Sequence, residues 1–172
     1  MNYSGNSIGW FYEGWQIYNE RFVEVVRDLS AEDLQVRPAP DGWPIWATVG
    51  HTAGARVYWL CGVFGEPGAG ATPFPDAMNG IGWEDDLNTP RTAAELTEAL
   101  ESTWRVIADC LQRWTPEMLF EQFAGQVGKK TQVQTRQGVL MRLLSHDAYH
   151  CGELSQTLGI YAMPQIDLWR PD

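Results

Sequence analysis

Residues 138–159, GVLMRLLSHDAYHCGELSQTLG, contain two of the three histidines in the chain. His146 and His150 are four positions apart, and on an α-helix this spacing places two side chains on one face with Cβ atoms about 5–6 Å apart. Two imidazoles at that separation can bind one metal ion. Glu153 follows His150 by three positions, so the same face carries a carboxylate one turn further along. The stretch therefore predicts a helix with a candidate metal site.

The ends and the apolar pattern of this helix can also be predicted. Thr135 is suited to act as its N-cap, and Gly159 is placed as a C-terminal glycine. One stripe comprises Val139, Leu143, His146, His150 and Glu153, and a second comprises Leu140, Leu144, Cys151, Leu154 and Leu158. Polar groups within an apolar stripe must be satisfied, and one metal ion would satisfy both histidines. Because only one stripe can face its own bundle along the full length, the other predicts a homodimer interface.

The spacing of the two histidines does not by itself define a metal site. Two histidines four positions apart can be hydrogen-bonded core side chains, or can fall by chance on a solvated face. The metal interpretation therefore depends on a third ligand elsewhere in the chain.

Three further helices are expected before this one, at residues 7–29, 43–63 and 92–114. The first has apolar residues at alternating steps of three and four, which is the seam pattern of a helical bundle: Ile8, Phe11, Trp15, Tyr18, Phe22, Val25 and Leu29. Trp43-Pro44 opens the second helix with an early proline, and Thr92 with Glu95 forms a capping box that begins the third. The sequence thus predicts one all-α domain over residues 1–172, a four-helix bundle.

The segments between these helices are less regular. Residues 65–91 form a long loop between the second and third helices, and loops of this length are often functional covers. Apolar residues at its start and within it predict that it lies against the body, namely Phe64, Phe74, Met78, Ile81 and Trp83. Residues 125–130 are expected to form a turn and residues 131–135 a short extended segment. The tail after Tyr161 is expected to wrap back over the bundle.

Composition excludes several classes of function. The 172 residues carry a net charge of −10, which argues against nucleic acid and anionic membrane surfaces as partners. The N-terminus has no basic and apolar pattern of a secretory signal, and no apolar run is long enough to cross a membrane. Three scattered cysteines fit no zinc-ribbon spacing and are typical of reduced thiols in a cytoplasmic protein.

The remaining histidine, His51, is expected about two turns into the second helix, among small residues that would let another helix or a ligand approach. Together with His146 and His150 it would provide three neutral nitrogen ligands and leave a fourth position open, as in catalytic zinc sites. Glu153 could be a fourth ligand, an acceptor for an imidazole N–H, a catalytic base, or an exposed helix carboxylate.

Two segments carry a family resemblance. His51 within WPIWATVGHTAGARVYWL (43–60), followed by TRQGVLMRLLSHDAYHCGEL (135–154), resembles the DinB/YfiT-like superfamily of metal-dependent four-helix-bundle proteins. The resemblance implies that His51, His146 and His150 are the metal ligands, that the bundle has a crossed-over connection, and that the protein is a homodimer. Glu153 stands where the superfamily pattern usually has Gln.

The resemblance also implies an activity, because relatives include S-transferases and isomerases that use low-molecular-weight thiols such as bacillithiol or mycothiol. The leading hypothesis is accordingly a transferase or isomerase in which a divalent metal ion (Zn, Ni or Fe) activates a small thiol toward an electrophile. An aromatic mouth is expected from Trp10, Trp46 or Trp83. A metal-dependent hydrolase and a non-catalytic metal- or ligand-binding module remain alternatives, since the residues do not separate them.

Overall fold

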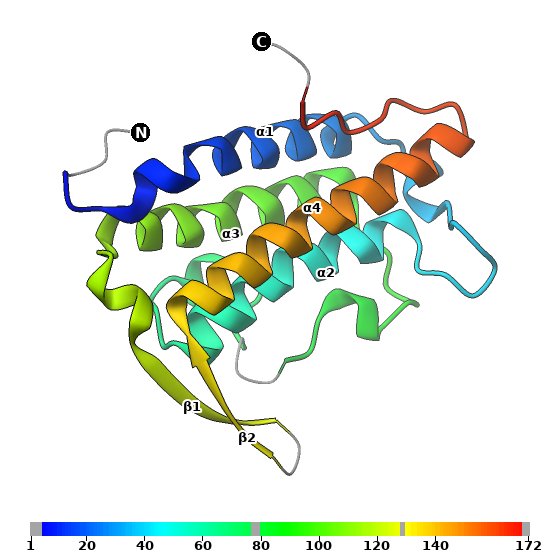
Figure 1. Cartoon of the computed structure of the whole chain (residues 1–172). Coiled ribbons are helices and arrows are strands. Elements are labelled where there is room, and N and C mark those ends of the chain that lie inside the picture. The colour runs from blue at the N-terminus through cyan, green and yellow to red at the C-terminus, as the bar shows by residue number, and fades with distance from the viewer. Residues whose placement is uncertain (1–4, 77–79, 128–129, 170–172) are drawn as a thin grey trace.

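The structure, a computed structural model, describes residues 5–76, 80–127 and 130–169. Within these residues four long helices form an elongated bundle, as predicted (Figure 1). They are α1 (Glu13–Arg27), α2 (Ile45–Val57), α3 (Ala93–Arg113) and α4 (Arg136–Ile160). None of the helices in these ranges is long and apolar enough to cross a membrane.

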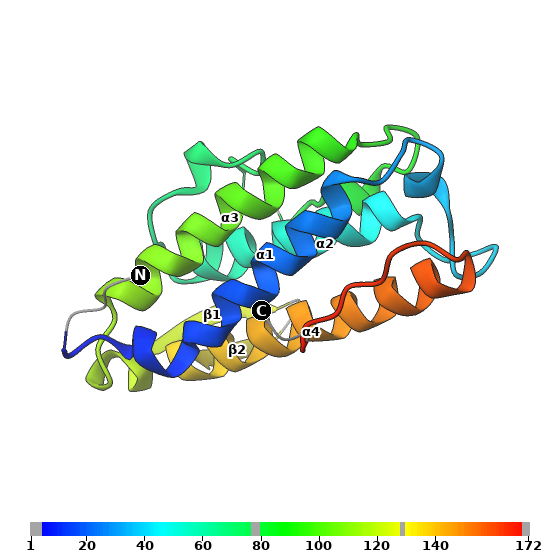
Figure 2. The ribbon, with the colours of Figure 1, turned by 90° about the horizontal axis from the view of Figure 1, so that it is seen from above.

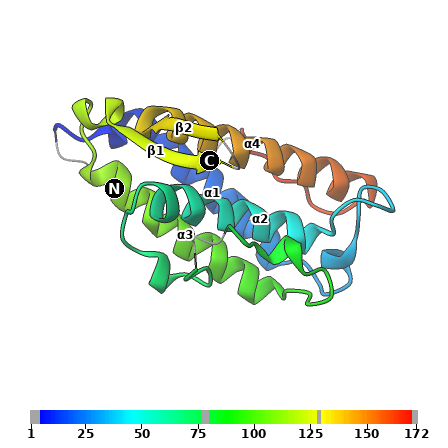
Figure 3. The same cartoon turned by 90° about the horizontal axis from the view of Figure 1, so that it is seen from below.

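The helices are arranged so that α1 lies across the bundle from α2, and α3 lies across it from α4. α3 packs against both α1 and α2, and α4 packs against α2 and α1 from the other side. Seen from above and from below, α1 and α2 lie one over the other in the middle, with α3 and α4 at the two edges of the bundle (Figure 2, Figure 3). This confirms the crossed-over connection, and it places α2 directly beside α4, the two helices that carry the histidines.

Local capping explains where most of these helices begin. The Thr92 side chain accepts a hydrogen bond from the Glu95 backbone and completes the predicted capping box, and Thr135 Oγ1 accepts one from the Gly138 backbone. The expectation for Gly159 is wrong. It lies inside α4, and the left-handed conformation that follows the helix is taken by Ala162 at φ 57°.

The first predicted helix is divided into two pieces. Ile8–Tyr12 is a 3₁₀ helix, and Tyr12, with φ −119°, interrupts the backbone before α1. The apolar stripe therefore does not keep its phase, and Phe11, expected in the core, is 83% exposed. The second predicted helix also changes geometry, since Tyr58–Val63 continues α2 as a π-helix.

A β-hairpin precedes α4 and was only partly expected. Strand β1 (Gln122–Val127) pairs antiparallel with β2 (Lys130–Thr135). The extended segment at 131–135 is confirmed, but most of the expected turn at 125–130 is strand, and residues 128–129 lie outside the described ones. The hairpin projects from one end of the bundle (Figure 1).

Both apolar stripes of α4 are buried in their own bundle. The buried residues come from both stripes and include Val139, Leu140, Leu143, His150, Cys151, Leu154 and Leu158. The premise that one stripe is left free for a dimer interface is therefore wrong, and the homodimer itself stays a prediction. The tail covers part of the same helix, as expected: Ile166 is buried, and its carbonyl accepts a hydrogen bond from Ser155 Oγ at 2.9 Å.

The long loop lies against α2, also as expected. Phe74 packs over Gly54 and Trp83 packs over Gly50, so the small residues of α2 allow this close approach. Phe64 is buried in the core, but Ile81 is 72% exposed, contrary to expectation. Met78 lies outside the described residues. The described part of the loop contains the short 3₁₀ helices Ala69–Ala71 and Trp83–Asp85.

Candidate metal centre

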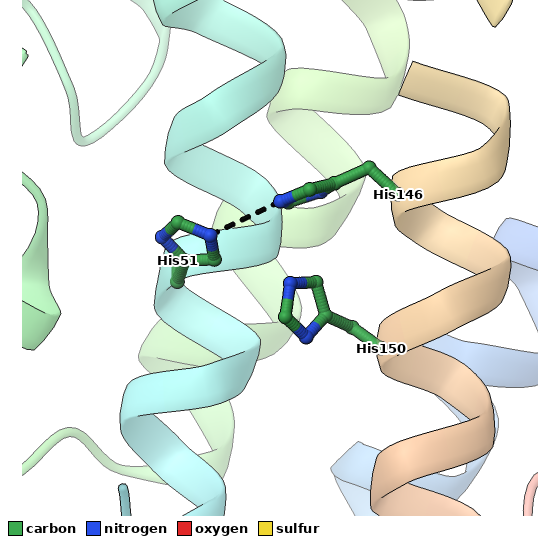
Figure 4. A group of neighbouring side chains, drawn as sticks. All are labelled: His51, His146 and His150. Atoms are coloured by element: carbon green, nitrogen blue, oxygen red, sulfur yellow. Dashed lines mark hydrogen bonds between the residues drawn. The ribbon is translucent and has the colours of Figure 1, made fainter. Parts of the chain in front are cut away.

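The three histidines meet between α2 and α4. His51 comes from α2, and His146 and His150 come from consecutive turns of α4, with all three rings directed toward one another (Figure 4). The Nε2 atoms of His51 and His146 are 3.0 Å apart. One nitrogen from each ring can be chosen so that all three lie within 4.8 Å of one another. Because α2 packs beside α4, histidines almost a hundred positions apart in the sequence come together.

Two carboxylates contact the outer nitrogens of this cluster. The Nδ1 atom of His51 donates to Glu84 Oε1 at 2.5 Å, and the Nδ1 atom of His150 donates to Glu153 Oε2 at 2.8 Å. An ionised carboxylate only accepts hydrogen bonds, so in each neutral ring the proton resides on Nδ1 and the lone pair on Nε2. Hydrogen bonds of this kind fix the tautomer and orientation of metal-binding histidines.

Burial keeps the rings of His146 and His150 uncharged. Burial lowers the pKa of His146 to about 3, and the neighbouring charges of His150 and His51 act in the same direction. Burial also lowers the pKa of His150, although its hydrogen bond to Glu153 opposes this effect. Both rings are consequently neutral near pH 7, which is the form in which imidazole binds a metal ion.

The donor set fits a divalent cation. Tetrahedral coordination with zinc–nitrogen bonds of about 2.0–2.1 Å places ligand nitrogens about 3.3 Å apart. The observed separations, 3.0 Å for one pair and at most 4.8 Å for any pair, bracket this value. Among the described residues, the buried Nδ1 atom of His146 has no hydrogen-bond partner, so no protein acceptor competes for the orientation of this ring. Imidazole nitrogens suit Zn, Ni, Fe and Cu alike.

No cysteine completes the cluster. Cys151, which follows His150, is buried in the apolar core, and burial raises its pKa to about 12, with the charge of Asp147 acting in the same direction. Cys61 and Cys110 are also free thiols, as the sequence predicted.

A cavity of about 610 Å³ lies beside the histidines. His51 and His146 form part of its wall, together with the aromatic side chains of Tyr58, Trp59, Phe74 and Trp83. The guanidinium of Arg142 also lines it and lies 4.6 Å from the centre of the Trp59 ring. The cavity thus joins the histidine nitrogens to an aromatic surface that also carries the Arg142 guanidinium and the carboxylates of Asp76 and Glu84.

The sequence identified this aromatic mouth only in part. Trp83 lines the cavity as expected, but Trp46 is completely buried in the core and Trp10 lies on the 3₁₀ helix before α1. The expectations for Trp46 and Trp10 are therefore wrong. Glu84 and Arg142 were missed. The only sequence signal for Glu84 was its place in a long loop with apolar residues, whereas Arg142 stands one helical turn before His146.

The bundle and its cluster define a class of protein, a helical bundle with three histidines that converge between two helices beside a cavity. The DinB superfamily model matches residues 16–154. The chain therefore belongs to the DinB superfamily.

A solved structure agrees with this assignment at the level of the fold. The crystal structure of a DinB-like protein from Bacillus cereus ATCC 10987 is similar with a TM-score of 0.70 and 19% sequence identity, over 95% of this chain and 98% of that chain. No curated protein matches the chain significantly.

Proposed function

We propose that the protein is a divalent-metal-dependent transferase or isomerase that uses a low-molecular-weight thiol as co-substrate, with His51, His146 and His150 as the metal ligands. The observation that supports it best is the convergence of three imidazoles beside a cavity, with His51 and His146 forming part of the cavity wall. Membership of the DinB superfamily supports the same class of function. Three protein ligands leave a coordination position open to a substrate, which a purely structural site would close.

The chain's own thiols are poor nucleophiles, which favours a thiol from solution. Burial raises the pKa of Cys61, Cys110 and Cys151, so none of them is a thiolate near pH 7. A bound divalent cation supplies Lewis acidity, which lowers the pKa of a thiol and makes its thiolate available at neutral pH. The aromatic wall of the cavity would hold the electrophile against the histidine cluster.

Glu153 has an orienting role in this proposal. Its carboxylate accepts the Nδ1 proton of His150 and is partly exposed. A carboxylate engaged with a ligand histidine turns the Nε2 lone pair toward the metal position. This contact favours the acceptor role over the alternatives of a fourth ligand or a catalytic base.

The assembly and location are also proposed. The family resemblance supports a homodimer, and the three free cysteines are typical of a reducing compartment such as the cytoplasm. Sedimentation velocity at micromolar concentration would show a monomer if the dimer is wrong.

Elemental analysis of the purified protein, combined with a thiol-consumption screen, tests the function. We expect about one divalent metal per chain and consumption of one cellular thiol in the presence of an electrophile. Absence of bound metal would contradict the proposal, and so would hydrolytic turnover without thiol consumption.

His150→Ala is the matched variant for this screen. It removes one ligand and should abolish metal binding and turnover, yet cost only about 1–3 kcal/mol of stability through a cavity and a lost hydrogen bond. Circular dichroism melting shows whether the variant is folded. An active variant without metal would contradict the assignment of His150.

A further inference from the structure

Among the described residues, Glu84 makes the one hydrogen bond to the histidine rings that comes from outside the two histidine-bearing helices. It reaches His51 from the 3₁₀ helix Trp83–Asp85, within the long loop between α2 and α3. Its side chain is only 13% exposed, and the separation to His51 Nδ1 is 2.5 Å. The hydrogen bond to a ligand histidine therefore exists only while this part of the loop lies on α2.

The loop is held on α2 by contacts on both sides of Glu84. Trp83 lies so close to Gly50 that a Cβ atom there would be 3.0 Å from the Trp83 ring, and Phe74 lies over Gly54. The two rings also pack on each other with centroids 4.9 Å apart. After Glu84, the Asp85 side chain accepts the backbone N–H of Gly82 at 2.8 Å and closes the turn. These contacts determine where the Glu84 carboxylate is placed.

A second feature shows that the turn is shaped for this carboxylate. Glu84 folds back over Gly82, where an added Cβ would lie 2.0 Å from Glu84 Oε2. Any side chain at position 82 would therefore displace the glutamate in its present conformation. Gly82 leaves the space through which Glu84 turns inward to His51.

We propose that Glu84 is a positioning residue for the metal ligand His51, and that docking of residues 80–86 on α2 is energetically coupled to metal binding. The inference rests on the metal-binding part of the proposed function. A carboxylate that accepts the Nδ1 proton holds His51 in the tautomer and orientation that direct Nε2 to the metal, and raises its basicity. By thermodynamic reciprocity, a metal on His51 must stabilise the docked loop by the same factor by which the docked loop strengthens metal binding.

The coupling gives the loop a functional role. Residues 80–84 line the cavity beside the histidines, so the same segment shapes the substrate site and supports a ligand. Loading of the metal would therefore order one wall of the cavity.

Metal affinity tests the proposal directly. Zn²⁺ and Ni²⁺ would be titrated against a chromophoric chelator in the wild type, Glu84→Ala, Glu84→Gln and Asp76→Ala. Loss of such partners typically weakens metal binding 10–100-fold, and we expect this for Glu84→Ala. Glu84→Gln keeps an oxygen acceptor and should recover part of the affinity. Asp76 lines the same cavity, so Asp76→Ala controls for a change in its charge.

Hydrogen–deuterium exchange of residues 80–91 provides the second readout. Zn²⁺ should slow exchange in this segment of the wild type, and should do so much less in Glu84→Ala. Trp83→Ala, which keeps Glu84 but removes its neighbour's packing, should also weaken metal binding. Circular dichroism would show that the variants are folded.

The outcomes separate this proposal from the proposed function. A wild-type protein that binds neither metal would overturn both. Two results would overturn only the role of Glu84. In the first, the wild type binds metal and the affinity of Glu84→Ala is within twofold of the wild-type affinity. In the second, Zn²⁺ slows hydrogen exchange in residues 80–91 equally in the two proteins.

Discussion

Asp147 stands between the two histidines of α4 in sequence, yet its carboxylate belongs to the core. Its Oδ2 atom accepts hydrogen bonds from Trp15 Nε1 at 2.8 Å and from Arg56 Nη2 at 2.9 Å. Arg56 is completely buried and Asp147 is 3% exposed. Successive residues of a helix point in different directions, so α4 presents imidazoles to the cluster and a carboxylate to the centre of the bundle.

Asp147→Ala is expected to destabilise the protein by about 3–5 kcal/mol, because it leaves the Arg56 guanidinium buried without its charged partner. Urea denaturation measures the change. The control is Glu101→Ala, which removes an exposed ion pair with Arg27 and should cost less than about 1 kcal/mol. Similar decreases in the free energy of unfolding in the two variants would show that the buried ion pair stabilises the protein no more than the exposed one.

For single residues, the sequence predicted the positions of those side chains whose placement depends only on neighbouring residues in the chain. His146, His150 and Glu153 share a helical face because of their spacing alone. His51 was placed correctly because the chain has only three histidines and the expected second helix carried the remaining one. Glu84 could not be placed, since it lies 33 positions after His51 and reaches it only because the loop folds back on α2.

The α2 helix offers a comparison of two glycines, Gly50 and Gly54. Replacing a glycine within a helix by alanine stabilises the helix by about 1 kcal/mol. An alanine at position 54 would meet Phe74 at an ordinary 3.4 Å, whereas one at position 50 would meet Trp83 at 3.0 Å. Gly54→Ala should therefore be stabilising, and Gly50→Ala should be less stable than Gly54→Ala by about 1 kcal/mol or more. Thermal melts compare the two variants. Equal increases in melting temperature would contradict the prediction, because they would mean that Trp83 moves away from position 50 without loss of stability.

Glu66 joins the start of the long loop to α3 and α4. It accepts hydrogen bonds from Arg113 at 2.8 Å, Arg136 at 3.0 Å and Trp114 at 3.0 Å. Burial alone would raise the pKa of Glu66, but these hydrogen bonds outweigh it and hold the pKa below its usual 4.5.

The stability that Glu66 contributes should therefore depend on pH. It is fully present above pH 4.5, where the folded and unfolded states are both ionised, and is lost as pH falls through the folded-state pKa because the unfolded state binds the proton first. Glu66→Gln should cost about 3 kcal/mol at pH 7, and the difference from the wild type should shrink below pH 4.5. Urea denaturation from pH 7 to pH 3.5 measures this, and a constant difference would contradict it.

Element boundaries were predictable where a side chain makes the cap. Thr92 and Thr135 satisfy backbone donors within three residues, a purely local interaction. The hairpin before α4 was harder to predict because its strands satisfy each other, and Gln122–Val127 has little apolar alternation of its own. Phe11 was misplaced for a related reason, since the interruption at Tyr12 has no clear signature in the repeat.

Across the whole molecule, a polar layer divides the core in two. Each long helix contributes one buried side chain to it: Asn19, Arg56, Thr103 and Asp147. Arg56 donates to Asn19 Oδ1 at 2.8 Å and to Asp147, and contacts Thr103 Oγ1 at 3.4 Å. An apolar cluster lies on either side of the layer. Hydrogen bonds from one guanidinium to three other helices favour a single register, and this register places His51 opposite His146 and His150.

The two apolar clusters predict that the fold does not need metal. They include fully buried side chains from every long helix, among them Trp15, Phe22, Trp46, Leu100, Ile107 and Leu143, whereas zinc fingers unfold without metal because they have almost no core. Chelation should therefore leave the helical circular dichroism signal unchanged at 25 °C.

Returning Zn²⁺ to the chelated protein should raise the melting temperature by mass action alone. A free concentration about 100 times the dissociation constant adds about 2.7 kcal/mol of stability, or about 5–10 °C for a chain of this size. His150→Ala is the control, because without a complete ligand set its melting temperature should not respond to the metal. Loss of the helical signal on chelation would instead show that the histidine cluster is part of what holds the four helices together, and would favour a structural metal over a catalytic one.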